Sequence, residues 1–162
     1  VLTKLPHAIP DDVIVMNQFY GQEGSKADAK QFRIRQAIGL ASGMSHVRTE
    51  KTVVADGIFI EDEVELSSGE FAELKAKCFK VIRKTRFVYR IPGTNLVWEV
   101  DNYHDLDLVT AEIELPYLDY PFLTEGYMED VIEKEVTGNP EFFNSTLAVP
   151  YEHKPTKLDV AT

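Results

Sequence analysis

The stretch at positions 98–115 reads WEVDNYHDLDLVTAEIEL, and it contains two short runs in which acidic and apolar residues alternate. Successive side chains of a β-strand point to opposite faces, so this alternation assigns the acids to one face of each run. The acidic positions are Glu99, Asp101, Glu112 and Glu114. The stretch therefore predicts two consecutive antiparallel strands, each with an acidic and an apolar face, and it predicts that Trp98 packs in the core.

Five further alternating runs precede this stretch, and turn residues separate them, as is typical of an antiparallel β protein. The seven predicted strands cover residues 13–20, 30–37, 46–54, 58–66, 85–91, 96–101 and 108–115. Asp56-Gly57 and Pro92-Gly93 are predicted hairpin turns, because glycine adopts positive φ without steric cost. The pattern indicates a mainly antiparallel β fold.

Two segments follow a helical pattern instead. In 67–80, Ser67 and Glu70 have the spacing of a capping box, and apolar residues then recur along one side at Phe71, Leu74 and Cys78. The second predicted helix lies within 126–136 and ends before Gly138-Asn139-Pro140. The tail from about Tyr151 has no apolar period, which favours a loosely held segment.

The bulk properties restrict the class of protein. A chain of 162 residues fits a single domain, which we assign to 1–150 with a tail at 151–162. The net charge of −10 disfavours nucleic acids and anionic membranes as general partners. One cysteine, Cys78, excludes an intramolecular disulfide and fits a reducing cytoplasm, and no apolar stretch approaches the ~20 residues of a membrane span.

Charges of one sign share a face on several predicted strands. Basic pairs occur at Arg33 and Arg35 and at Lys84 and Arg86, and acids alternate at Glu61, Glu63 and Glu65. One interpretation is that every strand simply shows a solvated face to water. The other is that crowded carboxylates hold Mg²⁺ or Mn²⁺ while the basic side chains bind a polyanion, with the polar faces lining the inside of a barrel.

Six short motifs resemble, in order, those of the CYTH domains, also called triphosphate tunnel metalloenzymes. They are FRIRQ (32–36), RTEKT (48–52), EDEVELS (61–67), IRKTRFVY (82–89), WEVDNYHDLDLVTAEIELP (98–116) and EVTGNPEFFNSTLA (135–148). The resemblance covers roughly residues 13–149. WEVD followed by AEIELP and then by the last motif is its most specific part.

The resemblance implies an α+β fold, mainly antiparallel, in which a closed eight-stranded barrel has helices packed outside. It implies a metal-dependent triphosphatase that acts on inorganic triphosphate or on an organic one such as thiamine triphosphate, with Mg²⁺ or Mn²⁺ as cofactor. The implied substrate-binding residues are Arg33, Arg35, Lys51, Lys84 and Arg86, of which Lys51 and Arg86 are the catalytic ones. The implied metal ligands are Glu61, Glu63, Glu99, Asp101, Glu112 and Glu114. We expect a monomer or homodimer without nucleic acid or membrane partners.

Three departures from the family pattern stand beside this match. The family's N-terminal E-x-E-x-K strand is not in this sequence, and VLTKLP resembles the segment that follows it, which is an argument for a chain that is incomplete or inactive as given. Phe59 stands where relatives often carry arginine, and Asp107 lies near a common glycine position. Class IV adenylyl cyclase and a non-catalytic module that binds nucleotides or polyphosphate therefore remain alternative functions, as does an acidic β-domain with solvated faces.

Overall fold

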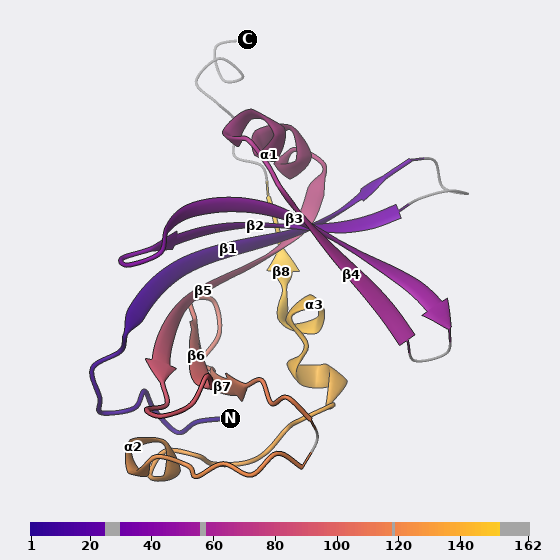
Figure 1. Ribbon diagram of the computed structural model, residues 1–162. Coiled ribbons are helices and arrows are strands. Elements are labelled where there is room, and N and C mark those ends of the chain that lie inside the picture. The colour runs from indigo at the N-terminus through magenta and orange to yellow at the C-terminus, as the bar shows by residue number, and fades with distance from the viewer. Residues whose placement is uncertain (25–29, 56–57, 118, 153–162) are drawn as a thin grey trace. The chain divides into compact units, whose positions relative to one another are not determined.

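The computed structural model describes residues 1–24, 30–55, 58–117 and 119–152, with the side chains of 51–54 and 58–59 left outside the description (Figure 1). Within these residues, eight strands and a few short helices make a mainly antiparallel α+β fold. In chain order they are β1 (Asp12–Glu23), β2 (Lys30–Gly39), β3 (Gly43–Ala55), β4 (Ile58–Glu65), α1 (Ser68–Lys75), β5 (Cys78–Arg90), β6 (Val97–Tyr103), β7 (Val109–Ile113), α2 (Gly126–Glu129), η1 (Pro140–Phe142), α3 (Asn144–Leu147) and β8 (Val149–Pro150).

The strands form one sheet in the order β4-β3-β2-β1-β5-β6-β7, and β8 pairs with the beginning of β5. All seven predicted strands are present, and the pairings of β3 with β4, β5 with β6 and β6 with β7 are antiparallel. β4 and β7 are the two end strands, and no pairing joins them within the described residues. The sheet is therefore not closed in this part of the chain.

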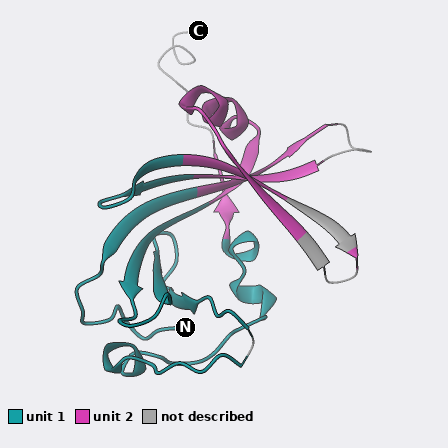
Figure 2. Ribbon diagram, in the orientation of Figure 1, with its two compact units in different colours: residues 1–17, 36–45, 82–147 teal, residues 18–35, 46–81, 148–162 magenta. Residues whose placement is uncertain are grey.

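The chain divides into two compact units, which Figure 2 shows in separate colours. Unit 1 comprises residues 1–17, 36–45 and 82–147, and unit 2 comprises 18–35, 46–81 and 148–162. The boundaries fall inside β1, β2, β3 and β5. Each unit has its own buried apolar cluster. The assignment of one domain to 1–150 stays a prediction.

The core of unit 1 forms where the apolar faces of β5 and β6 meet the N-terminal segment and α2. Its buried members are Leu2, Tyr89, Ile91, Leu96, Trp98, Val100, Met128 and Val131. The predicted packing role of Trp98 is thus confirmed. The Pro92-Gly93 turn is also confirmed, since Gly93 has a φ of +76° and the Ile91 amide donates to the Leu96 carbonyl.

The core of unit 2 packs α1 against the neighbouring strands. Its buried members are Phe19, Phe32, Ile34, Phe71, Cys78 and Val81. The capping box of α1 is confirmed, because the Ser67 hydroxyl accepts from the Glu70 amide while the Glu70 side chain accepts from the Ser67 amide. Tyr151 packs edge-on against Phe19 and its amide donates to Phe79, so the prediction that the tail loosens at Tyr151 is wrong for that residue.

Both predicted helices are shorter than their sequence patterns indicated. α1 ends at Lys75, and Cys78, expected on the helix, is instead the first residue of β5, although it is buried as predicted. The second helix has only four residues, Gly126–Glu129. Beyond it the backbone pairs with the N-terminal segment: Leu2 bridges Ile132, and Thr3 donates to the Val131 carbonyl. These long-range backbone bonds replace the predicted helical ones.

The predicted alternation of side chains between two faces is confirmed on β2 and β6. The polar faces of β6 and β4, however, differ in burial. On β6 both faces are buried at the end of the strand, because Trp98 and Val100 lie in the core while Asp101 and Tyr103, on the opposite face, are 1% and 5% exposed. On β4 the acids Glu61, Glu63 and Glu65 are exposed, and Val64 on the other face is 56% exposed. The solvated-face interpretation therefore fits β4 and is wrong for β6. The predicted Asp56-Gly57 turn lies outside the described residues.

Gly21 on β1 is expected to tolerate no side chain. A Cβ at this position would lie 2.6 Å from Cζ of Phe32 and 2.9 Å from the Lys77 carbonyl oxygen. We expect Gly21→Ala to lower the free energy of unfolding by about 1–3 kcal/mol through overpacking. Gly69→Ala in α1 is the control, since its Cβ meets nothing closer than 4.0 Å. Urea denaturation measures both, and equal midpoints for the two variants would contradict the prediction.

Candidate functional site

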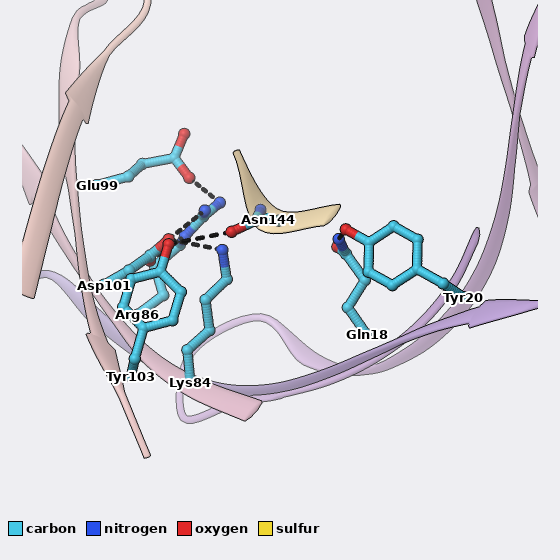
Figure 3. A network of polar contacts seen from close by, with 8 residues as sticks. All are labelled: Gln18, Tyr20, Lys84, Arg86, Glu99, Asp101, Tyr103 and Asn144. Carbon is cyan, nitrogen blue, oxygen red and sulfur yellow. Dashed lines mark hydrogen bonds and ion pairs between the residues drawn. The ribbon is translucent and has the colours of Figure 1, made fainter. Parts of the chain in front are cut away.

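A buried ionic cluster lies on the polar face of β5 and β6 in unit 1 (Figure 3). In the antiparallel register Arg86 is opposite Asp101, and Lys84 is opposite Tyr103. Glu99 lies two residues before Asp101 on the same face of β6. Alternation along two paired strands therefore brings two cations and two carboxylates together.

Asp101 is the centre of this cluster. Its Oδ2 accepts from Lys84 Nζ at 2.7 Å and from Arg86 Nη2 at 2.9 Å, and its Oδ1 accepts from Arg86 Nε at 2.8 Å. Arg86 Nη1 also donates to Glu99 Oε2. The side chains of Lys84 and Asp101 are each 2% exposed, whereas that of Glu99 is 32% exposed. The cluster is thus closed around Asp101 and more open at Glu99.

The two cations retain hydrogen-bond donors that these contacts do not use. An ammonium group has three N–H donors, and Lys84 directs one of them to Asp101. A guanidinium group has five, and Arg86 uses three of them for Asp101 and Glu99. No further hydrogen bond from either cation is found among the residues that the structure describes. The remaining donors suit an anion.

The pKa shifts follow from burial and from the charges in contact. Burial lowers the pKa of Lys84, and the charge of Asp101 does not fully compensate for it. Burial acts against ionisation of Asp101, but the hydrogen bond from Arg86 and the charges of Lys84 and Arg86 outweigh it, so the pKa of Asp101 is lowered. Asp101 is therefore strongly held as a carboxylate, while Lys84 lacks part of the compensation that its charge requires.

Glu112 extends the acidic side of the cluster from β7. It lies directly opposite Glu99, and its charge acts on both Lys84 and Arg86. Two opposed carboxylates repel each other, and oxygen ligands of this kind suit Mg²⁺ or Mn²⁺. Within the described part of the chain, no group of three or more His, Cys, Asp or Glu side chains could hold a metal ion. The pair supplies two carboxylates and not a complete cage.

Several predicted site residues lie outside this cluster. Glu114 follows the last residue of β7 and is exposed. Arg33 and Arg35 are partly buried on β2 of unit 2, and Glu61 and Glu63 are exposed on β4 of the same unit. The side chains of Lys51 and Phe59 lie outside the described residues, and Asp107 is exposed between β6 and β7. The roles assigned to these residues stay predictions.

The structure adds polar residues that the sequence analysis did not select. The Tyr103 hydroxyl donates to Asn144 Oδ1 at 3.0 Å, and Lys84 Nζ lies 5.6 Å from the centroid of the Tyr103 ring. Tyr103 shares its parity on β6 with Asp101, so alternation could have identified it. In unit 2, Gln18 Nε2 donates to the Tyr20 hydroxyl at 2.6 Å, and burial raises the pKa of Tyr20 against the opposing hydrogen bonds from Gln18 and Arg33.

Comparison with known proteins gives one similarity. The chain is 39% identical over 99 residues to a protein named inorganic triphosphatase from Acetivibrio thermocellus. The alignment covers 58% of this chain and 60% of that relative, so the similarity spans less than two thirds of the relative's length. No family model matches the chain, and no solved structure matches it. No helix in the described residues is long and apolar enough to cross a bilayer.

Proposed function

We propose that this chain is a triphosphatase of the CYTH, or triphosphate tunnel metalloenzyme, family and that it hydrolyses inorganic triphosphate. Two features of the sequence support the proposal: its similarity to the relative named inorganic triphosphatase and its ordered family motifs. The structural observation that carries it is the pair of cations, the buried Lys84 and the partly buried Arg86, which share Asp101 and keep unused donors.

A phosphate chain is the anion that best fits these donors. Lys84 presents a desolvated point charge, and Arg86 presents a rigid fork whose two remaining N–H groups match phosphate oxygens. In phosphoryl transfer most of the rate acceleration comes from positioning and from neutralising charge on the transferred group. Lys84 and Arg86 bind and orient phosphoryl oxygens in this proposal, and Asp101 fixes the direction of both cations.

The charge balance of the cluster favours a divalent cation as cofactor. Lys84 and Arg86 contribute two positive charges, and Glu99, Asp101 and Glu112 contribute three negative ones. A triphosphate would meet net repulsion at such a site unless a further cation accompanied it. Mg²⁺ in phosphoryl-transfer sites is bound by one or two carboxylates together with substrate oxygens, which fits Glu99 and Glu112. The metal would supply charge neutralisation at the phosphate.

The rest of the assignment rests on the resemblance and belongs to the same proposal. Arg33, Arg35 and Lys51 are further phosphate contacts, and Glu61, Glu63 and Glu114 are further carboxylates for the metal. The closed barrel that the resemblance implies belongs to this proposal too, and thiamine triphosphate is the organic substrate to compare with tripolyphosphate. We propose a cytoplasmic location and a monomer or homodimer.

The test is an assay of the 162-residue chain with sodium tripolyphosphate and with Mg²⁺ or Mn²⁺. We expect release of one orthophosphate and one pyrophosphate for each triphosphate consumed, and loss of this activity in excess chelator or in Lys84→Met. Parallel incubation with ATP separates the cyclase alternative, because a cyclase forms a cyclic nucleotide and pyrophosphate. Binding of tripolyphosphate in calorimetry without any product would contradict the enzyme and favour the binding module.

A further inference from the structure

The contact between Tyr103 and Asn144 joins the proposed site to the C-terminal part of unit 1. Tyr103 is the last residue of β6 and is 5% exposed, and Asn144 is the first residue of α3. The hydroxyl of Tyr103 donates to Oδ1 of Asn144 across a separation of 41 residues. Figure 3 shows the two side chains pointing toward each other beside Lys84 and Asp101.

The ring of Tyr103 lies next to the ammonium group of Lys84. The distance of 5.6 Å from Nζ to the ring centroid is within the range of a cation–π contact. Lys84 and Tyr103 are also direct partners across β5 and β6, so the strand register holds their backbones in place. The ring is one of the groups beside a Lys84 side chain that is only 2% exposed.

We propose that Tyr103 and Asn144 are positioning residues for Lys84. The hydrogen bond from the hydroxyl to Asn144 fixes the Tyr103 ring over the ammonium group, and the ring excludes water from it. A dry ammonium group binds an anion more strongly than a hydrated one, because charge interactions strengthen as the surrounding dielectric falls. The C-terminal segment at α3 therefore tunes how Lys84 holds phosphate. This inference rests on the proposed function for its consequence in catalysis, but the contact can be tested without it.

Other features of the pair agree with a structural and not a titrating role for Tyr103. Burial, together with the charges of Asp101 and Glu112, raises the pKa of Tyr103 to about 12. The phenol is therefore a neutral hydrogen-bond donor at physiological pH. It can donate to Asn144 without adding charge to a cluster that already holds three carboxylates.

The first experiment measures the accessibility of Lys84 directly. The chain is treated briefly with acetic anhydride, and acetylation at each lysine is quantified by mass spectrometry. Lys77, whose side chain is 55% exposed, is the internal reference. We expect Tyr103→Phe and Asn144→Ala each to raise Lys84 acetylation several-fold relative to Lys77, at a temperature where the circular dichroism of both variants is native. Unchanged acetylation of Lys84 in both variants would overturn the proposal.

The second experiment is a kinetic cycle with tripolyphosphate. Each single variant is expected to lower kcat/KM by roughly 3- to 10-fold, the effect of one neutral hydrogen bond. The kcat/KM of the double variant should be no lower than that of either single variant, because both substitutions remove the same hydrogen bond. If the two substitutions caused unrelated structural damage, their effects on kcat/KM would add. Additive losses, or unchanged kcat/KM despite faster acetylation, would overturn the positioning role. If the unmodified chain shows no turnover, the proposed function fails. The acetylation experiment still tests whether Tyr103 and Asn144 shield Lys84.

Discussion

Replacing Arg86 with lysine is expected to lower kcat/KM for tripolyphosphate by about 10²–10³-fold, the effect typical of removing a preorganised charge-stabilising donor. The substitution preserves the charge and removes the fork. Arg86 reaches both oxygens of Asp101 through Nε and Nη2 while Nη1 contacts Glu99, which leaves donors for phosphate. A lysine carries its three donors on one atom and cannot make these contacts together.

Arg83→Lys is the matched control for this variant. Arg83 also forms an ion pair from β5, with Asp105 at 3.3 Å, but both side chains are about 40% exposed. Pairs of this kind contribute little, so we expect the control to retain nearly all activity. Steady-state kinetics of the two variants side by side provide the measurement. If Arg86→Lys and Arg83→Lys retained equal activity, the site would not lie at Arg86.

Asp101→Asn is expected to lower the free energy of unfolding by about 3–5 kcal/mol, because removing one partner of a buried ion pair leaves uncompensated charge. The amide matches the carboxylate in shape, so no cavity contributes to the loss. Both Lys84 and Arg86 lose their shared partner in this variant. Asp105→Asn, which breaks the exposed pair with Arg83, should cost under about 1 kcal/mol. Urea denaturation measures the free energy of unfolding of both variants. If Asp101→Asn lowered it no more than Asp105→Asn does, the buried cluster would contribute little to stability.

The same variant also gives a pH signature. The folded-state pKa of Asp101 lies below its ordinary value of 3.8, since contacts with Arg86 and Lys84 outweigh the cost of burial. The unfolded chain therefore binds this proton at a higher pH than the folded chain does. The contribution of Asp101 to the free energy of unfolding is complete at pH values above the ordinary pKa of 3.8. It is lost as the pH falls through the lower pKa of the folded state. We expect Asp101→Asn to flatten the acid side of the stability curve, and an unchanged slope would contradict the assigned pKa.

Local patterns in the sequence predicted much of the framework. Alternation identified all seven predicted strands and the faces of β2 and β6, because side-chain direction in a strand depends only on position along it. The capping box located the start of α1 for a similar reason, since its two hydrogen bonds span three residues. The carboxylates of β6 and the cations of β5 were selected in the same way.

Helix ends and burial could not be read from such patterns. Cys78 has the spacing of a helical residue, but it begins β5, where it packs in one cluster with Phe32 and Phe71 and where β8 pairs with the strand two residues further on. The segment after α2 has apolar residues at helical spacing, but its backbone bonds go to the N-terminal segment. In both places a partner far along the chain offers more stabilisation than the local helix does.

The order of residues alone decides the direction in which each side chain points from its strand, because the backbone geometry of a strand is local. Which charges become neighbours depends on the tertiary structure. The pairing of Arg86 with Asp101 follows from the register of β5 and β6, and the contact of Tyr103 with Asn144 joins residues 41 positions apart. Registers and distant contacts are chosen by the free energy of the whole folded chain, in which burial of one face selects one alignment among several that local preferences allow equally.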